Sequence, residues 1–146
     1  MVNYNIGMAG PKLLYVGVKA VIYRKDKKIL LLRVNKENDP SFRGDWDLPG
    51  GRLLENNQTV FERLMFKIKE ETGIEGCKMV RLVAAGLVEQ SDLFLVVYLL
   101  DLGDQGDKLA TDRGHNEYDW VTPGEAASKL WQMSEELREG LRSLEI

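Results

Sequence analysis

Apolar residues follow a strand-like pattern over much of the chain. β-Branched and aromatic residues are concentrated in Leu13–Tyr23 and again in Ile29–Val34. A short polar segment joins these two runs, so they predict a β-hairpin. Two later runs, Lys78–Val88 and Leu93–Asp101, are almost continuously apolar. Strands that are covered on both faces have this pattern, so we expect both runs to lie inside a sheet.

Helical spacing is clearest between Thr59 and Gly73. Thr59 and Glu62 have the spacing of a capping box, and Gly73 suits the left-handed conformation that ends many helices. Apolar residues recur at intervals of three and four positions and predict a buried stripe. The stripe consists of Val60, Phe61, Leu64, Met65 and Ile68. Polar residues, including Glu70 and Glu71, are expected on the opposite, open face.

Shorter elements complete the predicted order. Short strands are expected at Trp46–Leu48 and Tyr118–Val121, and Thr122 followed by Pro123 has the pattern of a helix N-terminus. Ser134–Leu144 has leucines at helical spacing and predicts a last helix. A fold of the α/β class, with a mixed sheet and helices on both sides, fits this order of elements.

Length and composition indicate one ordinary globular domain. The chain has 146 residues, of which 44% are hydrophobic and 29% are charged. Glycine and asparagine recur before Leu13, so residues 1–12 are expected to form a flexible N-terminal arm and residues 13–146 a single domain. A net charge of −3 argues against a protein that binds nucleic acid through general basicity.

Residue counts and apolar run lengths exclude several kinds of site and location. Cys77 is the only cysteine and His115 the only histidine, which excludes an internal disulfide, a cysteine zinc cluster and a multi-histidine metal site. Met1–Gly10 lacks the basic start and apolar core of a secretory signal. The longest apolar run, Leu93–Leu100, is much shorter than a membrane-spanning helix. We therefore expect a cytoplasmic protein without a membrane partner.

Candidate chemistry lies at Gly50-Gly51 and Glu70-Glu71. Pro49 ends a short strand, and the two glycines, which lack Cβ atoms, let the backbone turn and lie close to a ligand. Neighbouring carboxylates that face such a turn can hold a hard divalent cation through oxygen. The alternative is a solvated helix face on which Lys67 forms ion pairs with the two acids.

The same two segments resemble a known signature. Leu48-Pro49-Gly50-Gly51-Arg52, and Glu70-Glu71-Thr72-Gly73-Ile74 at the matching distance, are similar to the box of the Nudix hydrolase family. The likeness extends from Val16–Val21 to Glu117–Ala126. It implies an α/β/α sandwich with a mixed sheet. It also implies a hydrolase that uses Mg²⁺ or Mn²⁺ to cleave the diphosphate of a nucleoside diphosphate derivative, and many such relatives pair as homodimers.

The box diverges from the family signature at three positions. Aligned from Glu70-Glu71, the family's Arg-Glu pair falls on Phe66-Lys67 and its earlier glutamate falls on Gln58. Aligned from the glycine turn, the pair falls on Met65-Phe66 and the glutamate on Asn57. Neither alignment restores the missing groups, so we expect a weakened or rebuilt metal site.

The resemblance, carried over residue by residue, assigns roles to the box. The predicted metal ligands are Glu70, Glu71, Gly51 through its backbone carbonyl, Glu55 and Gln58. Glu70, Glu71 and Lys67 are the predicted catalytic residues. If the Lys67 ammonium stayed about 5 Å from a divalent ion, repulsion at an effective dielectric of about 20 would cost about 6 kcal/mol. Its long stem also allows Lys67 to swing away or to contact a substrate phosphate.

Residues outside the box are candidates for substrate binding. Arg43 and Arg52 flank a predicted strand and are suited to contact phosphates, although isolated surface arginines are the alternative. Glu117 is a further substrate-binding candidate, and both Glu117 and Glu89 are candidates for the general base. Trp131 is expected to cover the sheet from a helix.

Two functions remain open at this level. One is a Nudix-type hydrolase of a nucleoside diphosphate derivative. The other is a catalytically weak or inactive Nudix-fold module that recognises a nucleotide or a protein. Phe66-Lys67 and Gln58 favour the second function, whereas Glu70-Glu71 and the glycine turn favour the first. The sequence identifies neither the substrate nor the general base.

Overall fold

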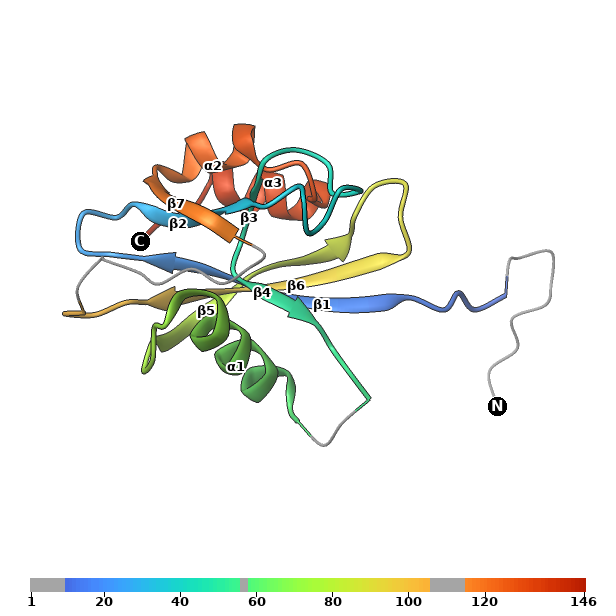
Figure 1. Ribbon diagram of the computed structural model, residues 1–146, viewed down its shortest axis with the longest axis horizontal. Helices are drawn as coiled ribbons and strands as arrows, with labels where there is room; N and C mark the ends of the chain where they lie inside the picture. Colours follow the sequence, from blue (N-terminus) through green and yellow to red (C-terminus); the bar gives the residue numbers. More distant parts are fainter. Residues whose placement is uncertain (1–9, 56–57, 106–114) are drawn as a thin grey trace.

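The computed structural model describes residues 10–55, 58–105 and 115–146. A mixed sheet forms the centre of the molecule, and helices cover both of its faces (Figure 1). Helix α1 (Val60–Thr72) packs on one face, whereas α2 (Pro123–Lys129) and α3 (Glu135–Arg142) pack on the other. This arrangement confirms the predicted α/β/α sandwich.

The sheet combines parallel and antiparallel pairs. Its strands are β1 (Tyr15–Tyr23), β2 (Ile29–Val34), β3 (Trp46–Asp47), β4 (Gly50–Arg52), β5 (Lys78–Leu87), β6 (Leu93–Asp101) and β7 (His115–Val121). The main order is β3-β2-β1-β6-β5, while β4 pairs with β1 and β7 pairs with β2. The pairing of β1 with β6 is parallel, and the other pairings are antiparallel.

Strand β4 is the one strand of the described residues that the sequence pattern does not predict. β1 and β2 pair only near their hairpin, at Tyr23 and Ile29, and then separate. β4 fills the space that this separation leaves, with Gly51 opposite Val18 and Gly50 opposite Lys19. The glycine turn is therefore a short strand, and it is held against the middle of β1.

Two apolar cores lie on the two faces of the sheet. Along β1, Val21 contributes to the core beneath α2 and α3, whereas Val18 and Ile22 contribute to the core beneath α1. Leu31 and Leu30 of β2 divide in the same way. Successive side chains of a strand point to opposite faces, so a strand covered on both sides is apolar throughout.

The ends of α1 agree with the prediction. The Thr59 hydroxyl accepts a hydrogen bond from the Glu62 amide, and the Glu62 carboxylate accepts one from the Thr59 amide. Gly73 follows the helix with a φ of 77°, in the left-handed region. Both caps are local signals, which is why the sequence predicts them well.

The faces of α1 are predicted less well. Leu64 and Ile68 are fully buried, as expected, but Phe61 is 43% exposed. The prediction that Glu71 lies on the open face is wrong, because only 4% of it is exposed. Glu71 follows Ile68 by three positions and Leu64 by seven, so the helical repeat places it on the buried face.

Strand β5 and Trp131 also differ from expectation. β5 is an edge strand that pairs only with β6 among the described strands, and Val80 and Leu82 are about half exposed. Its apolar run is therefore not covered on both faces. Trp131 lies just beyond the C-cap of α2 instead of within a helix, and it is 63% exposed.

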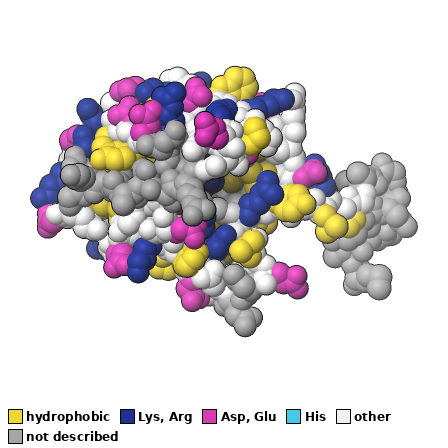
Figure 2. Space-filling model, viewed as in Figure 1, with side chains coloured by type: hydrophobic (Ala, Val, Ile, Leu, Met, Phe, Trp, Pro, Cys, Tyr) yellow, Lys and Arg dark blue, Asp and Glu magenta, His cyan; other side chains and the backbone are white. Residues whose placement is uncertain are grey.

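The predicted N-terminal arm falls largely outside the described residues, because the description begins at residue 10. Within the part of the chain that the structure describes, no helix has the length and apolar character needed to cross a membrane. Figure 2 shows Lys and Arg side chains interspersed with Asp and Glu over the face that is drawn. This distribution agrees with the low net charge.

Candidate functional site

The glycine turn is tied to the end of α1 by a buried carboxylate. The Gly50 amide donates a hydrogen bond of 2.8 Å to Oε1 of Glu71. Gly50 has a φ of 144°, and a Cβ atom at this position would lie 2.1 Å from the Val18 carbonyl oxygen. No other residue type fits this position, so Gly50 is required for the contact between β4 and α1.

The strand pairing leaves the Gly50 carbonyl available. Hydrogen bonds run from the Ala20 amide to the Pro49 carbonyl (2.9 Å) and from the Leu53 amide to the Val16 carbonyl (2.8 Å). Hydrogen-bonded and non-hydrogen-bonded pairs alternate along an antiparallel pair of strands. The pair of Gly51 with Val18 is therefore hydrogen-bonded, and the pair of Gly50 with Lys19 is not. The Gly50 peptide groups therefore face away from β1, toward Glu71 on one side.

Lys67 lies over the glycine turn and engages Glu70. Its Nζ atom is 2.6 Å from Oε1 of Glu70. The stem crosses Gly51 so closely that a Cβ atom there would lie 2.9 Å from the Lys67 Cε atom. The Lys67 side chain is 19% exposed and that of Glu70 is 44% exposed. The structure thus brings Lys67, Glu70, Glu71 and the glycine turn together, as the sequence predicts.

A second lysine, Lys19, lies beneath the turn, and no motif of the sequence indicates it. Lys19 of β1 donates to Oδ2 of Asp47 (2.8 Å) and to the Leu48 carbonyl (3.2 Å), and both side chains of the ion pair are buried. Burial lowers the pKa of Lys19, but the charges of Asp47 and Glu71 outweigh it and hold the pKa above its ordinary value. Lys19 is therefore a buried cation beside Gly50. Its position inside the apolar run of β1 is a signal that could have revealed it.

Two adjoining cavities, which share four lining residues, lie on this side of the molecule. The smaller, of about 250 Å³, is lined by Lys19, Asp47 and Gly51 among others. The larger has a volume of about 590 Å³ and includes Trp131. Both cavities are lined by Asp39, Phe42, Arg52 and Gln132, so these residues form their junction. Together the two cavities extend from Trp131 to Gly51 of the glycine turn.

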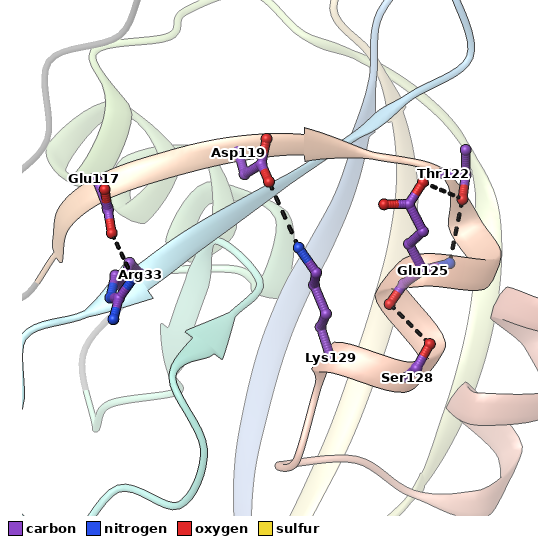
Figure 3. Close-up of polar contacts among 7 residues, drawn as sticks. All are labelled: Arg33, Glu117, Asp119, Thr122, Glu125, Ser128 and Lys129. Carbon is purple, nitrogen blue, oxygen red and sulfur yellow. Dashed lines mark hydrogen bonds and ion pairs between the residues drawn. The ribbon is translucent and has the colours of Figure 1, made fainter.

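The remaining predicted residues divide between the cleft and the outer surface. Arg43, Arg52 and Glu89 line the larger cavity. Glu117 lines neither cavity and instead forms an exposed ion pair of 2.7 Å with Arg33, where β7 runs beside β2 (Figure 3). Glu55 is exposed and lines neither cavity. The same is true of Gln58.

The donor atoms at the end of α1 suit a hard divalent cation, although they are engaged by other groups. Carboxylate oxygens of Glu70 and Glu71 and the Gly50 carbonyl are the ligand types that such ions prefer. Across residues 10–55, 58–105 and 115–146, no three His, Cys, Asp or Glu side chains cluster as a ready ion site. A cation at Glu70 must therefore compete with the ammonium of Lys67.

Comparisons with known proteins give one matching sequence family and several similar proteins. The sequence model described as NUDIX domain matches residues 13–144. An ADP-ribose pyrophosphatase of Methanocaldococcus jannaschii is 47% identical over 53 residues, which are 36% of this chain and 29% of that protein. The match thus spans well under two thirds of that relative.

Solved structures with the same fold include proteins from an archaeon, a nematode and a bacterium. A MutT protein from Methanosarcina mazei Go1 has 23% identity and a TM-score of 0.67, covering 92% of this chain and 94% of that one. An Ap4A hydrolase of C. elegans has 19% identity and a TM-score of 0.67, covering 86% and 92%. The dihydroneopterin triphosphate pyrophosphohydrolase of E. coli has 21% identity and a TM-score of 0.65, covering 91% and 97%. At these identities the likeness shows the fold alone.

Proposed function

The chain belongs to the NUDIX family, and we propose that it is a pyrophosphohydrolase that cleaves the diphosphate of a nucleoside diphosphate derivative. The observation that carries this proposal is the placement of Glu70 and Glu71 at a glycine turn whose amide Glu71 binds, beside a cleft lined by Arg52. Carboxylates, open peptide groups and a cation are the groups that diphosphate hydrolysis needs at one place.

The proposed metal site consists of Glu70, Glu71 and the backbone carbonyl of Gly50, since the ladder pairing with Val18 engages the Gly51 carbonyl that the sequence suggests as a ligand. Mg²⁺ or Mn²⁺ bound there would polarise a phosphate oxygen and lower the pKa of a bound water. Lys67 is the residue that adjusts this site. Its ammonium neutralises Glu70 when no divalent cation is bound. When a cation binds, the flexible stem lets the ammonium turn toward a substrate phosphate.

Cationic side chains in the cleft are proposed to bind the phosphates of the substrate. Arg52 lines both cavities, and Arg43 lines the larger one, so both are suited to bind phosphate oxygens. Glu89 lines the same cavity and is the better placed of the two predicted general bases. Glu117 is paired with Arg33 outside the cleft, which argues against its predicted role in substrate binding.

The substrate class is supported by the names of relatives. An ADP-ribose pyrophosphatase, an Ap4A hydrolase and a dihydroneopterin triphosphate pyrophosphohydrolase are among the similar proteins. Each of these names describes cleavage of a phosphate chain attached to a larger group. A nucleoside diphosphate derivative is therefore the class that we assign to this chain. A cytoplasmic location and a homodimer stay predictions.

One observation favours a second function, a module that binds nucleotides without hydrolysing them. Lys67 replaces a conventional acidic ligand of the Nudix signature, and its 2.6 Å contact with Glu70 blocks part of the metal site. If this contact persists in the presence of substrate and metal, the cleft retains its ability to bind a nucleotide, whereas the chemistry fails.

A panel of diphosphate compounds decides between the two functions. The protein is incubated with each compound and with Mg²⁺ or Mn²⁺, and the products are separated by ion-exchange chromatography. We expect metal-dependent cleavage that falls at least about a hundredfold in Glu70→Gln and in Glu71→Gln. Glu75→Gln is the matched control, because Glu75 is an exposed acid that pairs with Lys69 away from the turn.

Two results would contradict the proposed hydrolase. One is product formation at the rate of the blank for every compound, together with measurable nucleotide binding, which identifies the binding module. The other is cleavage that persists in both glutamine variants, which would place the chemistry elsewhere in the molecule.

A further inference from the structure

Trp131 is a large apolar side chain left unusually open. It lies just after α2, and 63% of it is exposed. Gly44 packs directly against its ring: a Cβ atom at Gly44 would lie 2.5 Å from the Trp131 Cδ1 atom. Gly44 has a φ of 80°, a conformation that favours glycine. The loop backbone thus supports the indole without covering it.

The exposed indole lines the larger cleft, and three arginines line the same cleft. Arg43, Arg52 and Arg138 line this cleft of about 590 Å³, against the acids Asp39 and Glu89. Arg138 donates to the Ala127 carbonyl at 2.7 Å. This hydrogen bond holds the Arg138 guanidinium near the C-terminal end of α2. A cleft with more cations than acids, in a chain of net charge −3, is suited to an anionic ligand.

Phe42 adds a second aromatic residue at the junction of the two cavities. The Lys36 ammonium donates to the Phe42 carbonyl and lies 5.8 Å from the centre of its ring. These contacts join two parts of the loop between β2 and β3, which carries Phe42. From this junction, the smaller cavity continues to Gly51 and Lys19 beside the proposed metal site.

We propose that Trp131 is the stacking platform for the base of the nucleoside diphosphate substrate, with Arg52 binding the phosphate chain at the junction. The inference rests on the proposed function, because hydrolysis at the glycine turn requires the diphosphate to lie there and the base to lie at the Trp131 end of the cleft. A flat π-system, one supported face and an open cleft are the features that base stacking uses. Stacking of this kind tolerates different bases, so Trp131 binds the planar group and does not select it.

The test measures binding and needs no turnover. Isothermal titration calorimetry compares ADP, GDP and UDP with inorganic pyrophosphate, which carries phosphates but no base. For Trp131→Ala we expect nucleoside diphosphate affinity to fall about tenfold or more, as base stacking on an aromatic ring predicts. Pyrophosphate affinity should change less than about twofold, because Arg52 remains in place to bind the phosphates. Trp131→Phe should keep most of the nucleotide affinity.

Phe61→Ala is the matched control, since Phe61 is an exposed aromatic residue on α1 outside both cavities. Circular dichroism verifies that each variant folds. The inference is overturned if the wild type binds none of the nucleotides, if Trp131→Ala leaves their affinity unchanged, or if it weakens pyrophosphate equally. A protein that binds nucleotides through Trp131 but cleaves nothing would contradict the proposed hydrolase and leave this inference intact.

Discussion

Lys67 and Glu70 form an ion pair of 2.6 Å at the end of α1, close to the glycine turn whose Gly50 amide donates to the buried carboxylate of Glu71. The chemistry of the site depends on which partner Glu70 takes. With Lys67 the pair is neutral and closed, whereas with a divalent cation Glu70 becomes a ligand. The partner of the Glu70 carboxylate therefore decides between a hydrolase and a binding module.

The first prediction reverses the charge at this position. Lys67→Glu should tighten Mg²⁺ binding by at least about tenfold, because it removes a repulsive charge and adds a carboxylate one turn before Glu70 and Glu71. Calorimetric titration with Mg²⁺ measures the change. Lys69→Glu is the control, since Lys69 pairs with Glu75 on the exposed side of α1. Equal affinity in Lys67→Glu and wild type would mean that Lys67 does not oppose the cation.

A second prediction concerns Cys77. Burial, with a smaller effect from the charge of Asp101, raises the pKa of its thiol from 9.0 to about 11. At pH 8 the folded protein should therefore react with a thiol reagent such as DTNB far more slowly than the unfolded chain, because the thiolate is the reactive form. Rapid labelling of the native protein at pH 8 would contradict the buried position.

The same shift makes stability depend on pH. The folded thiol holds its proton to a higher pH than the unfolded thiol, so its contribution to stability is complete below about pH 9 and is lost as the pH rises through about 11. Cys77→Ala should reduce the fall in the free energy of unfolding over that interval.

At the scale of elements, the buried pair of Lys19 and Asp47 joins β1 to β3 at 2.8 Å. Removing one partner leaves an uncompensated buried charge, so Lys19→Met or Asp47→Asn should lower the free energy of unfolding by about 3–5 kcal/mol. The double variant Lys19→Met with Asp47→Leu should recover much of this loss. Urea unfolding at pH 7 measures all three.

The pH dependence of this pair gives an independent check. The pKa of Lys19 is raised above its ordinary 10.5, so the stabilisation is fully present below that pH and is lost as the pH rises through the folded value. Wild type should therefore lose more stability above pH 10.5 than Lys19→Met does. Single variants as stable as wild type at pH 7 would show that the pair contributes nothing.

The elements also show which features a sequence can reveal. The caps at Thr59 and Gly73 depend on neighbours within a few residues, so α1 is predicted almost to its ends. β4 is missed because two of its three residues are glycines, which carry no side-chain pattern, and because its partner β1 is distant in the chain. The burial of Glu71 follows from the helical repeat, but its hydrogen bond with the Gly50 amide is a long-range contact that no local pattern indicates.

At the scale of the whole molecule, the sandwich brings together groups that no local pattern connects. Lys19 and Asp47 are 28 positions apart, and Trp131 reaches the cleft from beyond α2. The resemblance to the Nudix box predicts the fold and the presence of two acids near the glycine turn, because those residues lie in one continuous segment. It predicts neither the cleft nor Lys19, since both arise from the packing of separate elements around β1.

We propose that Glu70 and Glu71 hold a divalent cation although the ammonium of Lys67 competes for Glu70. Crystals of the wild-type protein grown with excess Mn²⁺ test it most directly, because the anomalous scattering of manganese locates the ion. We predict a peak within coordination distance of both carboxylates and a Lys67 ammonium turned away from Glu70. Absence of a peak there, with Lys67 still bound to Glu70, would contradict the claim.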